Sequence, residues 1–169
     1  LVLCVCIIGI FFGRHELSRM NEKLPSFTAT KGETYEELIV MKDGVKLHAT
    51  VMLPKGEGPF PSILIRNPYA RFTDIMQDRL CGRFVRYGYA CVLQDVRGQG
   101  KSEGKWSPML NEVKDGKDTI NWLIGQKFMD GNIAMVGPSY LASVQYAVAA
   151  SGLPQEVKTL VPAVYTTDL

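Results

Sequence analysis

Residues 132–144 read NIAMVGPSYLASV, and this stretch decides the fold. Its first half is a short apolar run typical of a buried strand, and small apolar residues follow Ser139 at helical spacing. Gly137 and Pro138 place a sharp turn between the two halves. A strand, a turn that carries one serine, and a helix form the context of a nucleophile elbow, in which the serine hydroxyl is lifted clear of the sheet.

A serine between a strand and a helix also has a second interpretation. Its side chain can cap the helix by accepting a hydrogen bond from a backbone N–H of the first turn. In an elbow, by contrast, the first N–H of the helix points to where an oxyanion would form. The pattern Gly-x-Ser-x-Gly is incomplete here because Leu141 occupies its last place. The choice between the two interpretations therefore depends on the rest of the chain.

Apolar runs and helical periodicities alternate on both sides of this stretch. Strands are expected at 35–41, 45–53, 62–65, 89–94, directly before Ser139 and at 157–161, and helices are expected at 74–87, 112–127 and 140–150. This alternation predicts an α/β fold with a mostly parallel sheet, to which the first two strands add an antiparallel N-terminal hairpin. The hairpin is expected to expose one face that carries His48, and the helix at 112–127 is expected to turn Val113 inward.

The composition indicates one globular domain. The chain has 169 residues, of which 46% are hydrophobic and 21% are charged, which is enough apolar content for a core. Its net charge of +2 is spread along the sequence without a basic stripe. We therefore expect no nucleic-acid partner.

The N-terminal region is expected to lie outside this domain. Residues 1–13 are almost wholly apolar but fall short of the ~20 residues that span a bilayer. We interpret them as a trimmed signal peptide or an anchor in contact with a membrane, for a secreted, periplasmic or membrane-anchored protein. A buried helix, which would fit a cytoplasmic protein, is the alternative. Residues 14–33 are expected to be a linker, which leaves 34–169 as the folded domain.

The cysteines do not predict a metal site. Cys4 and Cys6 lie in the apolar leader, and no spacing of cysteine with cysteine or histidine is typical of zinc. Cys81 and Cys91 fall in an expected helix and an expected strand. They are expected to be core thiols, with a disulfide between them as the alternative.

A glycine-rich loop at 95–104 could suggest a nucleotide. Its Gly100-Lys101-Ser102 is similar to the tail of a phosphate-binding loop. However, Asp95 stands where that loop needs a glycine, and Pro108 follows too soon for the helix that it needs. We expect no nucleotide and no other cofactor. The polar residues of the loop are expected to hold it in place as a network, and they are Asp95, Arg97, Ser102 and Glu103.

Five segments, one of them within the opening stretch, carry a resemblance to a known family. They read DGVKL at 43–47, RNPY at 66–69, QDVRGQGKSEG at 94–104, DTINWL at 118–123 and GPSYL at 137–141. In this order they resemble the cocaine-esterase-like and Xaa-Pro dipeptidyl-peptidase-like serine hydrolases. The likeness runs from about Thr34 to the end, and it departs from the family's elbow at Ala142, where the family has glycine. It implies an α/β-hydrolase fold that is incomplete at the C-terminus.

The resemblance also implies an activity and a site. The protein would cleave ester or amide bonds through an acyl-enzyme on Ser139, and its substrate would be a small-molecule ester, an amide or a short peptide. The backbone N–H of Tyr140 and the phenol of Tyr69 would hold the oxyanion. An Xaa-Pro dipeptidyl aminopeptidase is the alternative activity. A binding protein with the same fold but no catalysis is the alternative of another class.

The acid and the base that activate such a serine are not expected in this chain. A serine hydroxyl needs a histidine oriented by a carboxylate, and in this fold both follow the nucleophile. His15 and His48 precede Ser139, and Asp168 comes one strand too early to be assigned. We therefore expect 34–169 to be the N-terminal part of a catalytic domain and to be inactive by itself.

Overall fold

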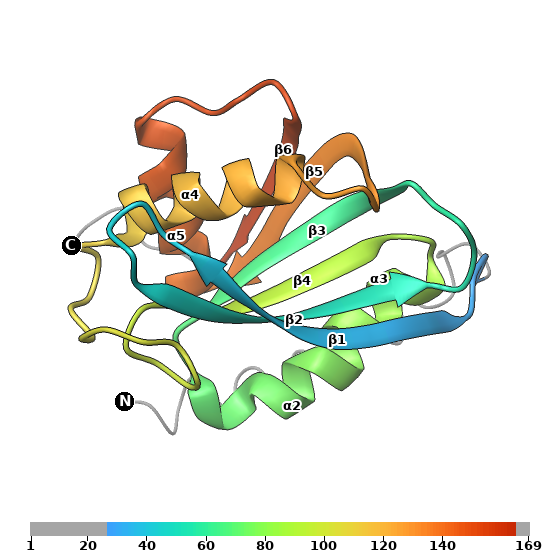
Figure 1. The fold of residues 1–169 in the computed structure, drawn as a ribbon, viewed down its shortest axis with the longest axis horizontal. Coiled ribbons are helices and arrows are strands. Elements are labelled where there is room, and N and C mark those ends of the chain that lie inside the picture. The colour runs from blue at the N-terminus through green and yellow to red at the C-terminus, as the bar shows by residue number, and fades with distance from the viewer. Residues whose placement is uncertain (1–26, 165–169) are drawn as a thin grey trace.

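The computed structural model describes residues 27–164, which form a six-stranded sheet with helices on both faces (Figure 1). The expected leader 1–13, residues 14–26 of the expected linker, His15 and Asp168 lie outside the described residues. The strands are β1 (Lys31–Val40), β2 (Lys46–Pro54), β3 (Phe60–Asn67), β4 (Ala90–Asp95), β5 (Met129–Pro138) and β6 (Val157–Ala163). They lie side by side in the order β1-β2-β4-β3-β5-β6.

The sheet is mostly parallel, and the expected antiparallel hairpin forms its first edge. β3 runs parallel to β4 and β5, and β5 runs parallel to β6. β1 and β2 form the hairpin, and β2 also runs antiparallel to β4. Asn67 at the end of β3 lies opposite Asp95 at the end of β4, and Leu64 lies opposite Met135 of β5. The segments that follow β3, β4 and β5 therefore all begin at the carboxyl ends of the parallel strands, where α/β sheets place their ligand crevice.

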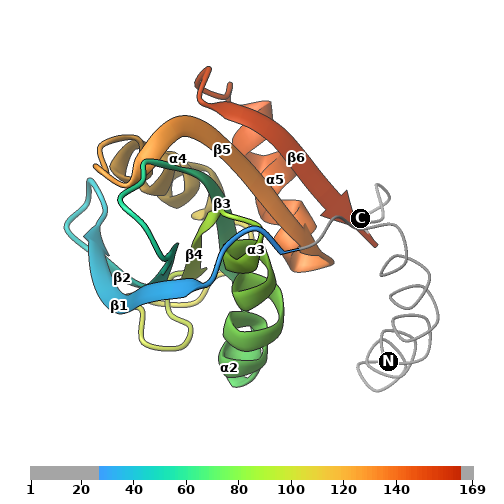
Figure 2. The same ribbon diagram turned by 90° about the vertical axis from the view of Figure 1, so that its right-hand side faces the viewer.

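Helices cover both faces of the sheet because successive side chains of its central strands point in opposite directions. The longer helices α4 (Glu112–Ile124) and α5 (Tyr140–Ala150) lie on one face, whose core includes Leu64, Val92 and Met135. The segment between β3 and β4 lies on the other face (Figure 2), whose core includes Ile63, Cys91 and Leu93. This segment consists of η1 (Ala70–Phe72), α2 (Thr73–Ile75), η2 (Met76–Cys81) and α3 (Gly82–Arg86).

The helix expected at 74–87 is not a regular α-helix. It opens with a 3₁₀ turn, and its middle part is π-helical, with the N–H of Gly82 bonded to the carbonyl of Gln77, five residues earlier. Cys81 and Cys91 form a disulfide between this segment and β4. The prediction of two core thiols was therefore wrong, and the alternative of a disulfide is correct. Two buried cysteines on facing elements can meet in this way, although their spacing in the sequence does not reveal it.

The hairpin does not have the exposed face that its alternating sequence predicted. His48 and Thr50 of β2 are each only 4% exposed. β2 lies between β1 and β4 rather than at the edge of the sheet. The loop after β4 also packs against β2, where Ser102 Oγ accepts the N–H of His48 at 2.9 Å. The first strand also begins at Lys31, three residues before the expected start of the domain.

The inward face of helix α4 differs from the expected one in its first turn. Ile120 and Leu123 are buried as predicted, but Val113 is 39% exposed. Glu112 and Asp115 are buried in its place. Both carboxylates pair with buried arginines, which compensates the cost of removing charge from water. The hydrophobic pattern alone could not indicate this because the buried positions are charged.

Candidate active site

Ser139 occupies a strained corner between β5 and α5. Its backbone has φ 56° and ψ −126°, a conformation that costs a residue other than glycine of the order of 1–3 kcal/mol. Gly137, with φ 146°, makes the corner possible because a Cβ atom there would lie 2.4 Å from the Cβ of Leu141. The helix begins directly afterwards, with Ala142 N–H and Ser143 N–H bonded to the carbonyl of Ser139 at 2.9 Å and 3.1 Å.

The hydroxyl of Ser139 does not cap the helix. No hydrogen bond joins it to the backbone of the first turn of α5. It lies instead 3.1 Å from the phenolic oxygen of Tyr69, a residue 70 positions earlier. This excludes the capping interpretation in this conformation and brings two of the three predicted site residues into contact. The third, Tyr140, contributes the first backbone N–H of α5 next to the same corner.

Tyr69 is held by the residues around the end of β3. Its N–H donates to Oδ1 of Asn67 at 2.9 Å, and Nδ2 of Asn67 donates to the carbonyl of Tyr69 at 3.3 Å. The same amide donates to Thr73 Oγ1 at 3.1 Å, and Thr73 donates to Asp95 Oδ1 at 3.2 Å. Asn67 and Asp95 are both at most 2% exposed. A buried, bonded chain therefore fixes the backbone that carries the Tyr69 phenol.

The loop at 95–104 forms the expected polar network. Its four predicted polar residues all bond to other segments or to the loop itself. Ser102 donates to the carbonyl of Asp95 at 2.6 Å, and Glu103 Oε2 accepts the N–H of Lys46 at 3.0 Å. Gly100 must be glycine because a Cβ atom there would lie 2.1 Å from Asp95 Oδ2. The network therefore holds the loop against β2, the end of β4 and helix α4.

His48 belongs to this network rather than to Ser139. Its Nδ1 lies 3.3 Å from Asp95 Oδ2, and its Nε2 lies 3.5 Å from Glu36 Oε2. Hydrogen bonding from Lys101 lowers the pKa of Glu36, so this carboxylate faces the ring in its charged form. With both ring nitrogens facing carboxylates, His48 is not oriented to accept the proton of Ser139.

Arg97 ties the loop to the N-terminus of α4. Its Nε and Nη2 donate to Asp115 at 2.8 Å and 2.6 Å, and Nη2 also donates to Asp43 Oδ1 at 3.1 Å. The bond to Asp115 raises the pKa of Arg97, and the bonds from Arg97 and then Lys114 lower the pKa of Asp43. Arg97 and Asp43 are therefore both charged at neutral pH.

Arg97→Lys is expected to loosen this loop locally. Lysine cannot present the two-pronged donor that binds Asp115, and a lost hydrogen bond to a charged group costs about 2 kcal/mol, or about 30-fold in local opening. Hydrogen exchange of the Gly98 and Ser102 amides, which are bonded within the loop, should accelerate by that factor. Lys114→Ala, which removes an exposed partner of Asp43, is the control and should change the rates by less than about threefold. Equal rates in Arg97→Lys and the original protein would contradict this role.

The sequence did not single out the buried pair Arg66 and Glu112. Arg66 is the last residue but one of β3, after the apolar run at 63–65, and its Nη1 lies 2.8 Å from Glu112 Oε2. Glu112 Oε1 in turn accepts the phenol of Tyr140 at 2.9 Å. Burial, and then the Glu112 carboxylate, raise the pKa of Tyr140, which keeps the phenol protonated as a donor. A charged residue inside the apolar strand was the one available signal.

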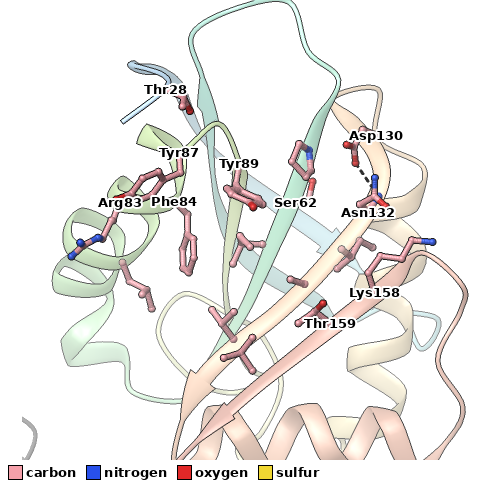
Figure 3. Close-up of a pocket in the computed structure, with 17 residues that line it drawn as sticks. Thr28, Ser62, Arg83, Phe84, Tyr87, Tyr89, Asp130, Asn132, Lys158 and Thr159 are labelled. Carbon is pink, nitrogen blue, oxygen red and sulfur yellow. Dashed lines mark hydrogen bonds between the residues drawn. The ribbon is translucent and has the colours of Figure 1, made fainter. Parts of the chain in front are cut away.

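A groove of about 1000 Å³ lies on the other face of the sheet, beside α3 (Figure 3). Apolar side chains of β3 and β5, with Phe84 and Tyr89, line much of it, and Asp130, Asn132 and Lys158 lie along one side. Neither Ser139 nor Tyr69 lines this groove. It is therefore separate from the candidate site, which lies at the carboxyl ends of the strands.

No cluster of three or more histidine, cysteine, aspartate or glutamate side chains among residues 27–164 has an arrangement that could hold a metal ion. None of the helices between residues 27 and 164 combines the length and the apolar character needed to cross a membrane.

The sequence of this chain is similar to sequences of known proteins. The sequence pattern of the family described as X-Pro dipeptidyl-peptidase (S15 family) matches residues 43–169. A cocaine esterase from Rhodococcus sp. (strain MB1 Bresler) is 39% identical over 136 residues, which cover 78% of this chain and 23% of the esterase. A putative Xaa-Pro dipeptidyl-peptidase from Bacillus anthracis is 31% identical over 93 residues, which cover 47% of this chain and 15% of the peptidase.

The fold is also similar to solved structures. An α-amino acid ester hydrolase superposes with a TM-score of 0.68 at 30% identity, covering 82% of this chain and 26% of that hydrolase. This likeness, together with the sheet order, confirms the predicted α/β-hydrolase fold. The chain spans about a quarter of the length of the esterase and of this hydrolase.

Proposed function

The chain belongs to the X-Pro dipeptidyl-peptidase (S15) family, and we propose that it supplies the nucleophile and the oxyanion donors of a serine hydrolase. Ser139 is the nucleophile, and the Tyr140 N–H and the Tyr69 phenol are the donors. The observation that supports this most directly is the 3.1 Å contact between the Ser139 hydroxyl and the Tyr69 phenol at a strained corner. Strain of this kind persists only where surrounding structure imposes it, and it concentrates at functional sites.

The reaction proceeds by acyl transfer. Ser139 Oγ forms a bond to the substrate carbonyl carbon, its proton passes to a general base, and the carbonyl electrons move to the oxygen. The Tyr69 phenol and the Tyr140 N–H donate to that oxyanion. The carbon–oxygen or carbon–nitrogen bond to the leaving group then breaks, and the leaving group takes up the proton. Water cleaves the resulting ester on Ser139 and restores the hydroxyl.

A fluorophosphonate probe tests the nucleophile directly. Ser139 Oγ should displace fluoride, and peptide mapping by mass spectrometry should find the phosphonyl group on the Ser139 peptide of the full-length protein. Heat-denatured protein is the control, since labelling requires an activated hydroxyl. Label on a different serine would contradict the assignment. Absence of any label under conditions that modify a known serine hydrolase would favour the non-catalytic binding protein.

The 169-residue chain by itself should react slowly with the same probe. Its described part offers His48 as a base, but the two nitrogens of that ring face the carboxylates of Asp95 and Glu36. A serine without its base is a weak nucleophile. Labelling of Ser139 in the isolated chain at the rate of the full-length protein would show that the base lies within these residues.

An acyl esterase is favoured over an Xaa-Pro dipeptidyl aminopeptidase. The likeness to the Rhodococcus cocaine esterase is higher and extends over more of this chain than the likeness to the Bacillus peptidase. The chemistry at Ser139 is the same in both cases. Comparing kcat/KM of the full-length protein for an aryl ester and for an Xaa-Pro anilide decides between them, and a preference for the anilide would support the peptidase.

A further inference from the structure

Arg66 is a buried cation next to the segment that carries Tyr69. It is 1% exposed and lies three residues before Tyr69, at the end of β3. Its Nε donates to Gln94 Oε1 at 2.9 Å, and its Nη1 donates to the backbone carbonyl of Glu112 at 3.1 Å. Nη1 also lies 2.8 Å from Glu112 Oε2. The guanidinium therefore fixes the end of β3 to the first residue of α4.

Glu112 extends this connection to α5. Its Oε1 accepts the phenol of Tyr140 at 2.9 Å, and the same phenolic oxygen accepts the N–H of Met109 at 2.8 Å. The ring of Tyr140 packs against Trp106 with centroids 5.3 Å apart. Glu112 is 2% exposed, so water does not compete strongly for these bonds. The half-buried side chain of Tyr140 is therefore held in place by Glu112, Met109 and Trp106, while its backbone N–H begins α5 beside Ser139.

We propose that Arg66, Glu112 and the Tyr140 phenol form a positioning bridge that sets the placement of the two oxyanion donors. One end of the bridge holds the end of β3, which leads to Tyr69, and the other end holds the first residue of α5, which supplies the second donor. The inference rests on the proposed function of Ser139. It adds a positioning role for the side chains of Arg66, Glu112 and Tyr140.

Burying the charges of Arg66 and Glu112 costs free energy, and a contribution to stability alone does not explain why the two charges are there. Two charged groups are removed from water, and a buried ion pair is often no more stable than apolar residues of the same shape. Arg66 Nη2 is in addition buried without a hydrogen-bond partner among residues 27–164. What the bridge does provide is direction, because its hydrogen bonds to the Glu112 carbonyl and from the Tyr140 phenol fix donor and acceptor in a geometry that apolar packing does not impose. Oxyanion donors need a fixed position, because misplacement of a donor by about 1 Å can lower the rate about 100-fold.

Two variants of the full-length protein separate positioning from stability. Tyr140→Phe keeps the ring against Trp106 but removes the bond to Glu112, while the Arg66–Glu112 pair remains. We expect kcat on an aryl ester to fall about 10- to 100-fold with KM changed less than about twofold. Glu112→Gln keeps an oxygen for the Tyr140 phenol but leaves Arg66 without its counter-charge. We expect it to lower the melting temperature more than Tyr140→Phe does, yet to lower kcat less than about fivefold.

A boronic acid inhibitor supplies a readout that loss of stability does not change. It forms a tetrahedral anion on the serine and so reports on the oxyanion donors. Its affinity for Tyr140→Phe should weaken by the same factor as kcat/KM. Tyr89→Phe, a change at an exposed tyrosine that lines the groove on the other face, is the matched control and should change neither quantity.

The results distinguish this inference from the proposed function. Unchanged kcat and inhibitor affinity in Tyr140→Phe, or rate losses that follow the order of the melting temperatures, would overturn the bridge. Ser139→Ala is measured in the same series. If Ser139→Ala is inactive and Tyr140→Phe is fully active, the proposed bridge is wrong, but the assignment of Ser139 as the nucleophile is supported. If Ser139→Ala is fully active, the proposed function itself fails.

Discussion

Replacing Ser139 with alanine is expected to lower kcat of the full-length protein on an aryl ester by a factor on the order of 10⁶. The hydroxyl forms the covalent bond in the proposed reaction, and no other group can take its place. The remaining oxyanion donors still bind the substrate, so a residual rate above that in water is expected. The loss is measured as the rate of aryl-ester hydrolysis by the variant relative to that of the original protein. The original protein blocked with the fluorophosphonate serves as a second reference for inactive enzyme.

The alanine variant should keep its fold, which makes the loss interpretable. Alanine has the same Cβ atom as serine and meets the same strain at φ 56°, and the hydroxyl makes no capping bond that would be lost. Ser143→Ala, one turn later on α5, is the matched control and should retain full activity. Residual activity above about 1% in Ser139→Ala, after exclusion of a contaminating enzyme, would point to a different nucleophile, since a lost nucleophile costs far more.

The strand–turn–helix corner at Ser139 could be predicted from the sequence because all its signals are local. An apolar run, Gly137 and Pro138, and a helical period lie within 13 residues, and the observed β5 and α5 meet at Ser139 as expected. The contact with Tyr69 is different, since it joins residues 70 positions apart. No spacing rule indicates it. It arises because β3 and β5 are neighbours in the sheet. Only the resemblance to known hydrolases implied that Tyr69 and Ser139 share one site.

The failures of sequence reasoning have two physical causes. His48 was expected in solvent because alternation in a hairpin usually marks an exposed face, but β2 is an interior strand that the loop at 95–104 covers. Val113 was expected inside because it is apolar, but Asp115 and Glu112 are buried as ion pairs. Hydrophobic patterns cannot represent a charge that is buried together with its partner. The bridge from Arg66 to Tyr140 was missed for the same reason.

Tyr69→Phe is expected to lower kcat about 10²- to 10³-fold while KM changes little. The phenol donates to an oxygen that is negatively charged only in the transition state, so its loss affects the barrier more than substrate binding. Phenylalanine keeps the ring, including its edge contact with Phe72 at 6.5 Å between centroids, and the backbone bonds to Asn67 do not involve the phenol. The change therefore removes one donor and leaves its surroundings intact.

The effect of Tyr69→Phe also separates two explanations of the 3.1 Å contact with Ser139. If the phenol is an oxyanion donor, burst kinetics with an aryl ester should show slower acylation and slower deacylation, because each step passes through a tetrahedral anion. If the phenol only orients the hydroxyl of the free enzyme, acylation alone should slow, since Ser139 Oγ is already bonded to the acyl group when water attacks. Tyr87→Phe, on the segment between β3 and β4, is the control that should leave both rates unchanged. A rise in KM at constant kcat would contradict both explanations and would mean that Tyr69 binds the substrate in its ground state.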